Sequence, residues 1–362
     1  MDLVRIIEGE TKLFVPDPDK YKLDSNMPVF FNPVMKLNRD ITVKIIQNSL
    51  KKPKVLDLLA GTGAKGLRIA KEVSGSKVDL NDGNPIAAKL IKKNAKLNKL
   101  KVEVFNNSAN KLLKKSRRKY DFIDVDPFGT PVPFLEDAIS RLRTGGILGV
   151  TATDTSALVG TYPKAGMRKY GVKVNRTKFM FEVGIRILIK RVVEEGIKQK
   201  IALEPIFSHS SNHYMRVYFR QTDKSLATIR KKVRPLFYCQ NCTNFKISEV
   251  FTNSKKRCAC GEYFEQLGPL WIGKLWDKRV IEDINGNKTI ELIKEESKLN
   301  VFGYFDYHAI AKRIEKKKDL PKMSRLIETI RKKGYKASRT HFSPTGIRSN
   351  IPPRTFLKLL TR

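Results

Sequence analysis

The stretch Val55-Leu-Asp57-Leu-Leu-Ala-Gly61-Thr-Gly63-Ala-Lys65-Gly66 decides the fold of this chain. It begins as a short apolar run, typical of a buried strand, and then passes through glycines into a region that reads as helix. Such a unit directs backbone N–H groups and a helix N-terminus toward a ligand. Asp82 follows the next apolar run, where an acidic side chain can bind ribose hydroxyls. Together they predict a site for a nucleoside cofactor; the alternative is a tight structural turn with a helix N-cap.

Short apolar runs alternate with amphipathic stretches on both sides of this loop. Strands are predicted at 55–59, 77–80, 102–105, 120–125 and 146–150, and helices at 66–73, 86–97 and 134–142. This alternation predicts an α/β, Rossmann-like domain with a mostly parallel sheet. Further helices are expected at 42–50, 180–195 and 322–333, and an alternating strand at 213–220.

The length and a shift in composition near residue 224 indicate two domains. We expect a cofactor-binding domain over 1–223 and a smaller α+β domain over 224–362. No apolar run approaches 18 residues, and the N-terminus lacks the pattern of a secretory signal. The four cysteines lie too close together for a disulfide framework, which indicates a reducing compartment and a cytoplasmic protein.

The charge balance is strongly basic. The chain has 72 Lys and Arg against 36 Asp and Glu, a formal net charge of +36. Such an excess attracts polyanions through phosphate neutralisation, so nucleic acid is the expected partner. A lysine-biased proteome or a heat-adapted surface would produce the same composition, so charge alone does not decide between these explanations.

Three details favour S-adenosylmethionine over a dinucleotide. Asp57 stands four residues before the first glycine, and the loop lacks the strict Gly-x-Gly-x-x-Gly pattern that fits a pyrophosphate. Ser108 and Ala109 follow the third predicted strand, where a polar side chain and a backbone N–H can meet an adenine edge. The tetrapeptide Asp126-Pro127-Phe128-Gly129 follows the fourth, at the sheet edge where ligands bind.

The tetrapeptide suits methylation of an exocyclic base amine. The lone pair of such an amine is delocalised, and a carboxylate with nearby carbonyls can hold its N–H groups and direct the nitrogen at the methyl group. Pro127 fixes the backbone so that these acceptors converge, and Phe128 offers a stacking surface to an extruded base. We therefore predict that Asp126, Pro127 and Phe128 are catalytic. The alternative is an ordinary β-turn, which Asp-Pro commonly opens.

Seven segments, in order over most of the chain, carry a family resemblance: Pro28-Val-Phe-Phe-Asn-Pro33, Leu37-Asn-Arg39-Asp40, Gly61-Thr-Gly-Ala-Lys-Gly66, Leu80-Asn-Asp82, Asp126-Pro-Phe-Gly129, Gly149-Val-Thr-Ala-Thr-Asp154 and Arg339-Thr-His-Phe-Ser-Pro-Thr-Gly-Ile-Arg348. With them the sequence resembles the tRNA (guanine-26-N2)-dimethyltransferase family. The resemblance implies a class I methyltransferase domain followed by a C-terminal domain unique to the family.

The resemblance also implies roles for single residues. Phe30 and Phe128 would sandwich or flank the guanine, and Asp126 would be catalytic. The residues implied to bind S-adenosylmethionine are Arg39, Lys65, Asp82, Ser108 and Ala109, beside Asp57, Gly61 and Gly63 of the loop. Arginine is expected at position 65 in this family, and lysine meets a carboxylate as a point charge rather than as a fork.

The four cysteines predict a structural zinc site. Cys239 and Cys242 have the Cys-x2-Cys spacing of a zinc knuckle, whereas Cys258 and Cys260 are one residue closer than usual and are followed by Gly261. The alternative is a degenerate knuckle in which Cys258 or Cys260 is not a ligand. The basic helices and hairpin expected after residue 300 resemble a winged helix that grips RNA phosphates.

The leading hypothesis is transfer of one or two methyl groups from S-adenosylmethionine to the N2 amine of guanine 26 in tRNA, with extrusion of the base. Alternatives are methylation of another exocyclic amine in RNA, or an RNA-binding protein that keeps the fold without catalysis. The sequence does not distinguish mono- from dimethylation, nor does it show whether a neighbouring guanine is modified or which oligomer forms.

Overall fold

The computed structural model describes residues 1–362 except 25, 212, 253–254, 314–319 and 361–362. Its contacts divide the chain into two compact units. Unit 1 consists of Met1–Thr153, Glu195–Ile206 and Arg216–Leu226, and unit 2 consists of Asp154–Glu194, Phe207–Met215 and Ala227–Arg362. These units are outlined differently from the domains expected at 1–223 and 224–362, and that functional division remains a prediction.

A seven-stranded sheet runs through unit 1, with strand order β5-β4-β3-β6-β7-β9-β8. Its strands are β3 (Lys54–Asp57), β4 (Lys77–Asn81), β5 (Glu103–Phe105), β6 (Tyr120–Val125), β7 (Leu142–Ala152), β8 (Ala202–Ser211) and β9 (Tyr214–Thr222). The first five strands in chain order pair in parallel, as predicted. The order reverses between β3 and β6, and ligands bind at such switch points in open α/β sheets.

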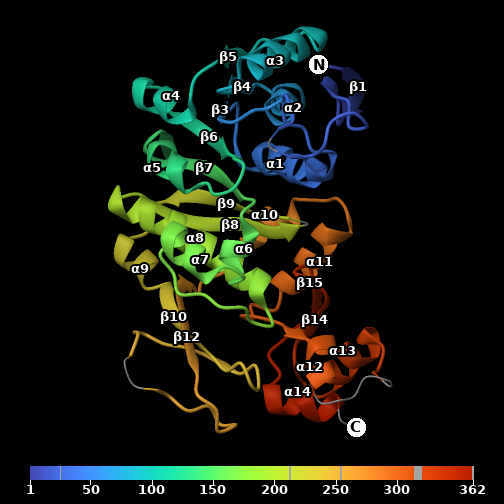
Figure 1. Cartoon of the computed structure of the whole chain (residues 1–362), viewed down its shortest axis with the longest axis vertical. Coiled ribbons are helices and arrows are strands. Elements are labelled where there is room, and N and C mark those ends of the chain that lie inside the picture. The colour runs from blue at the N-terminus through green and yellow to red at the C-terminus, as the bar shows by residue number, and fades with distance from the viewer. Residues whose placement is uncertain (25, 212, 253–254, 314–319, 361–362) are drawn as a thin grey trace. The chain divides into compact units, whose positions relative to one another are not determined.

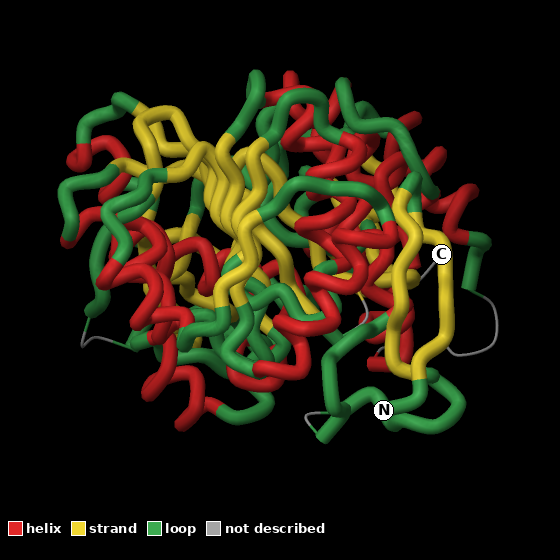
Figure 2. The backbone as a smooth tube through the Cα atoms, turned by 90° about the horizontal axis from the view of Figure 1, so that it is seen from above, coloured by secondary structure: helices red, strands yellow, loops and turns green. Residues whose placement is uncertain are grey.

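Helices cover this sheet, and a helix was predicted from the sequence for each of them except the one at 109–115. They are α1 (Lys36–Ser49), α2 (Ala64–Glu72), α3 (Pro85–Leu97), α4 (Ala109–Lys115) and α5 (Val132–Ser140). Helix α1 packs on α2, α4 packs on α5, and Figure 1 shows these pairs on opposite sides of the strands. The strands viewed in Figure 2 form a twisted layer between helices. The strands are apolar on both faces because helices cover both: Val55, Phe122 and Ile147 are fully buried.

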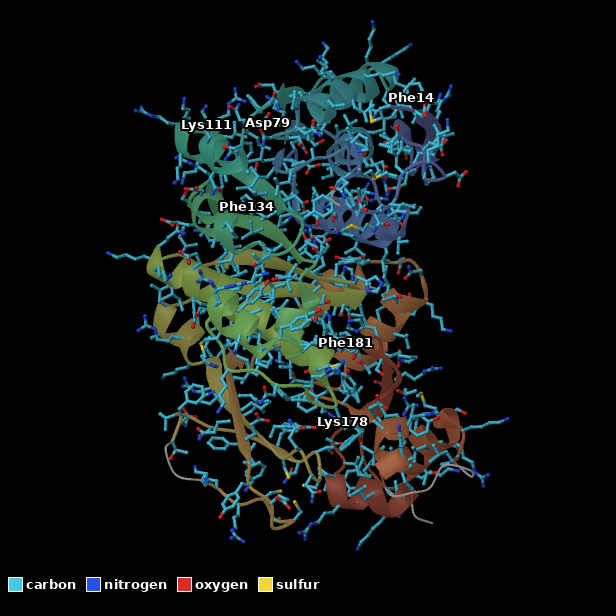
Figure 3. All side chains as sticks on the ribbon, viewed as in Figure 1. Phe14, Asp79, Lys111, Phe134, Lys178 and Phe181 are labelled. Carbon is cyan, nitrogen blue, oxygen red and sulfur yellow. The ribbon has the colours of Figure 1, made fainter. Side chains whose placement is uncertain are left out.

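Two elements of unit 1 extend this core. The hairpin of β1 (Leu3–Glu8) and β2 (Thr11–Pro16), which sequence reasoning did not identify, packs against α3. Asp79, in the middle of β4 (Figure 3), accepts a hydrogen bond from the Tyr120 hydroxyl at 2.8 Å. Lys111 on α4 is exposed, as expected for the outer face of a basic protein.

Unit 2 contains two small antiparallel sheets, ordered β11-β10-β12 and β13-β15-β14. Its remaining elements are α6 (Thr155–Leu158), α7 (Pro163–Tyr170), α8 (Met180–Lys198), α9 (Leu226–Arg230), β10 (Val233–Tyr238), β11 (Phe245–Ile247), β12 (Glu265–Trp271), α10 (Lys278–Glu282), α11 (Lys288–Ser297), β13 (Phe305–Asp306), α12 (Tyr307–Arg313), α13 (Met323–Lys332), β14 (Ala337–Thr340), β15 (Ser343–Ser349) and α14 (Pro353–Leu360). The predicted helix–helix–hairpin order after residue 300 is confirmed, around a core that includes Ile330, Ile347 and Phe356. Within the described residues, no helix has the length and apolar character needed to cross a bilayer.

Candidate active site and cysteine cluster

The glycine loop joins β3 to α2 at the switch point of the sheet. Gly61 and Gly63 both have positive φ, +55° and +80°, which glycine adopts without steric cost. A Cβ on Gly61 would stand 2.8 Å from the backbone oxygen of Phe30, so a larger residue does not fit there. Asp57 accepts a hydrogen bond from the Gly66 N–H at 2.9 Å, and its carboxylate therefore supports the turn from inside.

Asp82 lies directly beside this loop. One carboxylate oxygen accepts from the Gly61 N–H at 2.8 Å and the other accepts from the Asn84 N–H at 2.8 Å. Burial raises its pKa more than these two N–H donors lower it. The residues that the sequence paired for a ribose are thus neighbours in the structure, and binding of the ribose itself stays a prediction.

Asn81, the last residue of β4, ties together three loops at this edge, and sequence reasoning did not select it. Its amide nitrogen donates to the backbone oxygens of Leu58 and Asn107, each at 3.0 Å, and its amide oxygen accepts from the Asn107 N–H at 3.2 Å. Ser108 follows as the N-cap of α4, and Ala109 is buried in its first turn. The predicted adenine-binding pair therefore lies on a loop fixed to the glycine turn.

The Asp126-Pro127-Phe128-Gly129 segment leaves β6 beside that loop. Its end is clamped to residue 153, because the Gly129 N–H donates to the Thr153 hydroxyl at 2.6 Å and the Thr153 N–H donates to the Gly129 oxygen at 2.9 Å. The Asp126 side chain is 15% exposed. One of its oxygens accepts from the Asn38 amide at 3.3 Å, a contact not predicted from the sequence.

A buried ion network surrounds Asp126. The Lys65 ammonium contacts Asp124 and Asp126, each at 2.5 Å, and Arg216 on β9 pairs with the second oxygen of Asp124 at 2.5 Å. Burial works to raise the pKa of Asp126, but the positive charges of Lys65 and Arg216 outweigh it and the pKa is lowered. Asp126 is consequently a carboxylate at neutral pH. Lys65, expected at the cofactor, connects the glycine loop to the Asp126 loop.

The same network acts on Asp57 in the opposite direction. Burial and the negative charge of Asp124 raise the pKa of Asp57 to about 7, although Lys65 and the Gly66 N–H oppose the shift. Three carboxyl groups thus share two cations, and the Asp57 carboxyl titrates near neutrality. The network was not foreseen, although Asp124, a buried acid two residues before Asp126 on the same strand face, was a signal in the sequence.

Phe30 and Phe128 come together as the resemblance implied. Their ring centroids are 4.3 Å apart with an interplanar angle of 70°, and the Phe128 side chain is 54% exposed. In this arrangement the rings touch edge to face, so a base that stacks between them has to separate them. The structure places both rings beside the Asp126 loop; their contact with guanine stays a prediction.

Arg39 has a partner within the chain. Its guanidinium forms two 2.6 Å hydrogen bonds with the Glu8 carboxylate and a third, at 3.2 Å, with the backbone oxygen of Asn32. Arg68 also donates to Glu8, at 3.0 Å. Arg39 therefore joins the N-terminal hairpin to α1, and its predicted role at the methionine carboxylate needs an exchange of partners.

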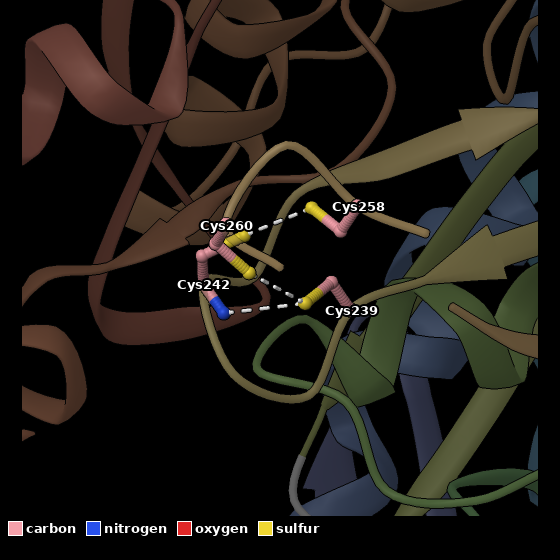
Figure 4. A group of neighbouring side chains, drawn as sticks. All are labelled: Cys239, Cys242, Cys258 and Cys260. Carbon is pink, nitrogen blue, oxygen red and sulfur yellow. Dashed lines mark hydrogen bonds between the residues drawn. The ribbon is translucent and has the colours of Figure 1, made fainter. Parts of the chain in front are cut away.

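All four cysteines meet in unit 2 (Figure 4). The sulfurs of Cys239 and Cys260 are 3.5 Å apart, those of Cys242 and Cys258 are 3.4 Å apart, and all four lie within 4.8 Å of one another without a disulfide. The shorter Cys-x-Cys spacing is accommodated by a turn with Gly261 at φ +96°. Both cysteines of the second pair lie within the cluster, and their ligation of zinc stays a prediction.

The segment from Arg339 to Arg348 forms most of the β14–β15 hairpin and its inward side is buried. Arg348 is fully buried and bonds Glu182 at 2.7 Å and Glu296 at 2.9 Å. His341 donates from Nδ1 to Glu296, while its Nε2 accepts the Ser210 N–H at 3.2 Å. Its side chain is 1% exposed, so His341 is a packing residue of the buried hairpin side.

Comparisons with known proteins agree with the architecture. A family model described as N2,N2-dimethylguanosine tRNA methyltransferase matches residues 9–361. A tRNA (guanine(26)-N(2))-dimethyltransferase of Methanosphaera stadtmanae is 38% identical over 97% of this chain and 95% of its own length. A tRNA (guanine(26)-N(2)/guanine(27)-N(2))-dimethyltransferase of Aquifex aeolicus is 38% identical over 97% of this chain and 93% of its own.

A solved structure of Trm1 from Pyrococcus horikoshii with S-adenosyl-L-methionine is similar over the whole chain. It superposes with a TM-score of 0.84 at 29% sequence identity, covering 99% of this chain and 100% of that one. The mostly parallel α/β sheet and the C-terminal elements are therefore shared with a protein that binds this methyl donor.

Proposed function

Because the chain belongs to the N2,N2-dimethylguanosine tRNA methyltransferase family, we propose that it transfers methyl groups from S-adenosylmethionine to the N2 amine of guanine 26 in tRNA. The observation that carries the proposal is the Asp126 carboxylate, held ionised at the carboxyl edge of the sheet beside the glycine loop and two aromatic rings. The full-length similarity to the relatives supports the substrate.

The residues at the sheet edge fit the cofactor. The half-buried Asp82 carboxyl would meet the ribose, Gly61 lets the loop pack closely against the Phe30 backbone, and Ser108 and Ala109 begin α4 where an adenine edge would lie. Lys65 and Arg39 are the cations that would meet the methionine carboxylate. When bound, S-adenosylmethionine supplies an electrophilic methyl group.

Asp126 would receive the guanine amine. An ionised carboxylate accepts hydrogen bonds from the amine N–H groups and holds the nitrogen in line with the methyl donor, so positioning contributes most of the rate. Phe30 and Phe128 would stack on the extruded base once their rings separate. A strong general base is not required, because the alkylated amine becomes acidic and Asp126 can take up its proton.

Unit 2 would hold the rest of the tRNA. In the segment 237–264, which also carries the four cysteines, the basic side chains of Lys246, Lys256 and Arg257 line a cleft of about 360 Å³ together with Phe237 and Phe264. Among the described residues that line this cleft, none is a carboxylate. Cations over aromatic walls suit an RNA backbone and its bases.

The cysteine cluster is proposed to bind structural zinc. Zn–S bonds of about 2.3 Å in a tetrahedron place the sulfurs about 3.8 Å apart, close to the 3.4 and 3.5 Å observed. Asn241 and Asn244 donate to the sulfurs of Cys260 and Cys258, which suits thiolates. Elemental analysis of the purified protein should show about one zinc per chain, and Cys239→Ser should lose it; a metal-free protein would contradict the assignment.

The activity is tested with unmodified tRNA. The protein is incubated with this RNA and labelled S-adenosylmethionine, and nucleosides and fragments are analysed by mass spectrometry. We expect N2-methylguanosine and N2,N2-dimethylguanosine at position 26, and a second map of position 27 decides whether the neighbour is modified. Methylation confined to adenine or cytosine amines would contradict the guanine assignment; tRNA binding without methylation would support the non-catalytic alternative.

A further inference from the structure

Side chains from two helices donate to one oxygen of the Asp126 carboxylate. The Asn38 side-chain amide donates to Oδ2 at 3.3 Å, and the Lys65 ammonium donates to the same oxygen at 2.5 Å. Asn38 lies in the first turn of α1, and Lys65 lies in the first turn of α2. A carboxylate that is held at one oxygen from two elements has little freedom to rotate, so its other oxygen keeps a fixed direction.

The orientation of the Asn38 amide follows from its surroundings. Asn38 is fully buried, and the Thr42 hydroxyl donates to its backbone oxygen at 2.7 Å and to its side-chain Oδ1 at 3.3 Å. An ionised carboxylate only accepts hydrogen bonds, so the amide turns its NH2 group to Asp126 and its oxygen to Thr42. The reverse orientation would bring two acceptors together in a buried place, which is costly.

Thr42 is fixed in turn by the neighbouring sheet. Its hydroxyl lies 2.7 Å from the Tyr218 hydroxyl on β9, and since Thr42 donates to Asn38, Tyr218 is the donor in this pair. The Tyr218 ring lies against the buried guanidinium of Arg216, at 4.4 Å. A Cβ on Gly149 would overlap Nη2 of Arg216, so the glycine leaves the room that this arginine occupies. Asn38 is thus held by buried groups of α1 and β9.

We propose that Asn38 is a positioning residue for methyl transfer, whose amide fixes the orientation of the Asp126 carboxylate so that the oxygen not bonded to Lys65 meets the guanine amine. This inference rests on the proposed role of Asp126. Asn38 contacts neither the amine nor the methyl donor in the proposed reaction and acts through Asp126. Lys65 supplies charge to the shared oxygen, and Asn38 supplies direction, because its planar NH2 group donates along a fixed line.

The charge of Asp126 depends on several groups around it. The charged residues that surround it are Lys65 on α2, Arg216 on β9, Asp124 on β6 and Asp57 on β3. The two cations lower the pKa of Asp126, and burial works to raise it. The Asn38 amide favours the ionised form as well, since it donates to the carboxylate. Loss of this donor therefore acts in the same direction as burial.

The test removes the amide donor in the full-length protein. Asn38→Leu keeps a branched side chain without a donor, and Asn38→Ala places less demand on the packing. We measure kcat and KM for unmodified tRNA at saturating S-adenosylmethionine, the pH dependence of kcat, the cofactor Kd and the melting temperature. Thr340→Val is the matched control, because its buried hydroxyl donates to the Glu296 carboxylate at 2.6 Å in unit 2.

A double-mutant cycle decides whether Asn38 acts through Asp126. Each Asn38 variant is also made together with Asp126→Asn, and its effect on kcat is compared in the two backgrounds. A residue that orients the Asp126 carboxylate has nothing left to orient once that carboxylate is replaced by an amide. A residue that only stabilises the fold lowers kcat by the same factor in both backgrounds.

We expect both Asn38 variants to lower kcat about 10- to 100-fold, since a misplacement of about 1 Å costs on the order of 10²-fold. The acidic limb of the kcat profile should move to higher pH, because loss of a donor raises the pKa of Asp126. KM for tRNA and the cofactor Kd should stay within about threefold of wild type. In the Asp126→Asn background the same variants should change kcat less than about twofold. Thr340→Val should lower the melting temperature and keep the wild-type kcat and pH profile.

Two results would overturn the inference. One is a wild-type kcat and pH profile for Asn38→Ala while Asp126→Asn is slow, which would leave the role of Asp126 standing. The other is an equal loss of kcat in both backgrounds, which would assign Asn38 a structural role. If Asn38→Leu does not fold, the alanine variant and its double mutant decide. Turnover of Asp126→Asn near the wild-type rate is a separate result, since it would contradict the proposed function itself.

Discussion

Two buried ion networks, one in each unit, are built from the same kinds of residue. The catalytic-edge network consists of Asp57, Lys65, Asp124, Asp126 and Arg216. The hairpin network consists of Glu182, Arg186, Glu296, His341 and Arg348. Each joins residues that lie far apart in the sequence, and each places an arginine between two carboxyl groups or beside one.

The two networks differ in balance and exposure. In the hairpin network two arginines face two glutamates, the carboxylates have no exposed surface, and the pKa of Glu296 is held at about 2 by His341 and Arg348 against the effect of burial. In the catalytic-edge network three carboxyls face two cations, and Asp126 reaches the surface. A buried network in which cations match the carboxylates stabilises the fold. A network with more carboxyls than cations, one of them exposed, is suited to bind a ligand and to take part in a reaction.

Removing the charge of Asp126 should lower methyl-transfer activity strongly and leave the stability of the fold nearly unchanged. Asp126→Asn keeps the shape but loses the charge, and methyl transfer to tRNA should fall at least about 10³-fold. Because an excess carboxylate is removed, the melting temperature should stay within a few degrees, and the cofactor Kd should stay within about threefold. Labelled methyl transfer and calorimetry measure both effects. Turnover near the wild-type rate would show that the Asp126 carboxylate is not needed for methyl transfer.

Removing Arg348 should lower the stability of the protein while cofactor binding persists. Arg348→Met leaves the buried carboxylates of Glu182 and Glu296 without this partner, and the free energy of unfolding of unit 2 should fall by about 3–5 kcal/mol. Denaturant titration measures the loss, and cofactor binding should persist at low temperature. The control is Lys332→Met, whose exposed pair with Glu328 should contribute less than about 1 kcal/mol. Equal effects of the two substitutions would contradict a structural role for the hairpin network.

The pH dependence sharpens the comparison further. The pKa of Asp57 is about 7 in the folded protein, above its ordinary value, so its protonated form stabilises the fold at low pH and this contribution is lost as pH rises through 7. Asp57→Asn should therefore gain stability relative to wild type between pH 5 and pH 8, on the order of 1–3 kcal/mol. Melting temperatures across this range provide the measurement. A difference that is constant with pH would mean that Asp57 is already ionised at pH 5.

Much of unit 1 could be predicted because its signals are local. Apolar runs, glycines and the spacing to Asp82 report on strands and turns within a few dozen residues, and the structure confirms the parallel sheet around them. The meeting of the four cysteines could be predicted for the same reason, since they span 22 positions.

The supporting residues of the site were missed because their partners are distant in the chain. Arg216 lies 92 positions from Asp124, and no local pattern connects them. Asn38 is an ordinary polar residue until the fold brings it to Asp126. The signal available was an arginine within the apolar alternation of 213–220, which is expensive to bury without a partner.

The close approach of Gly149 to Arg216 has a consequence for the history of this protein. A methyl group at position 149 and a guanidinium at position 216 cannot occupy the same space. A lineage that replaced the glycine first would lose the arginine's place, and one that replaced the arginine first would leave Asp124 with a single cation. Drift at either site therefore meets a barrier unless both change together, so the two positions should be inherited as a unit.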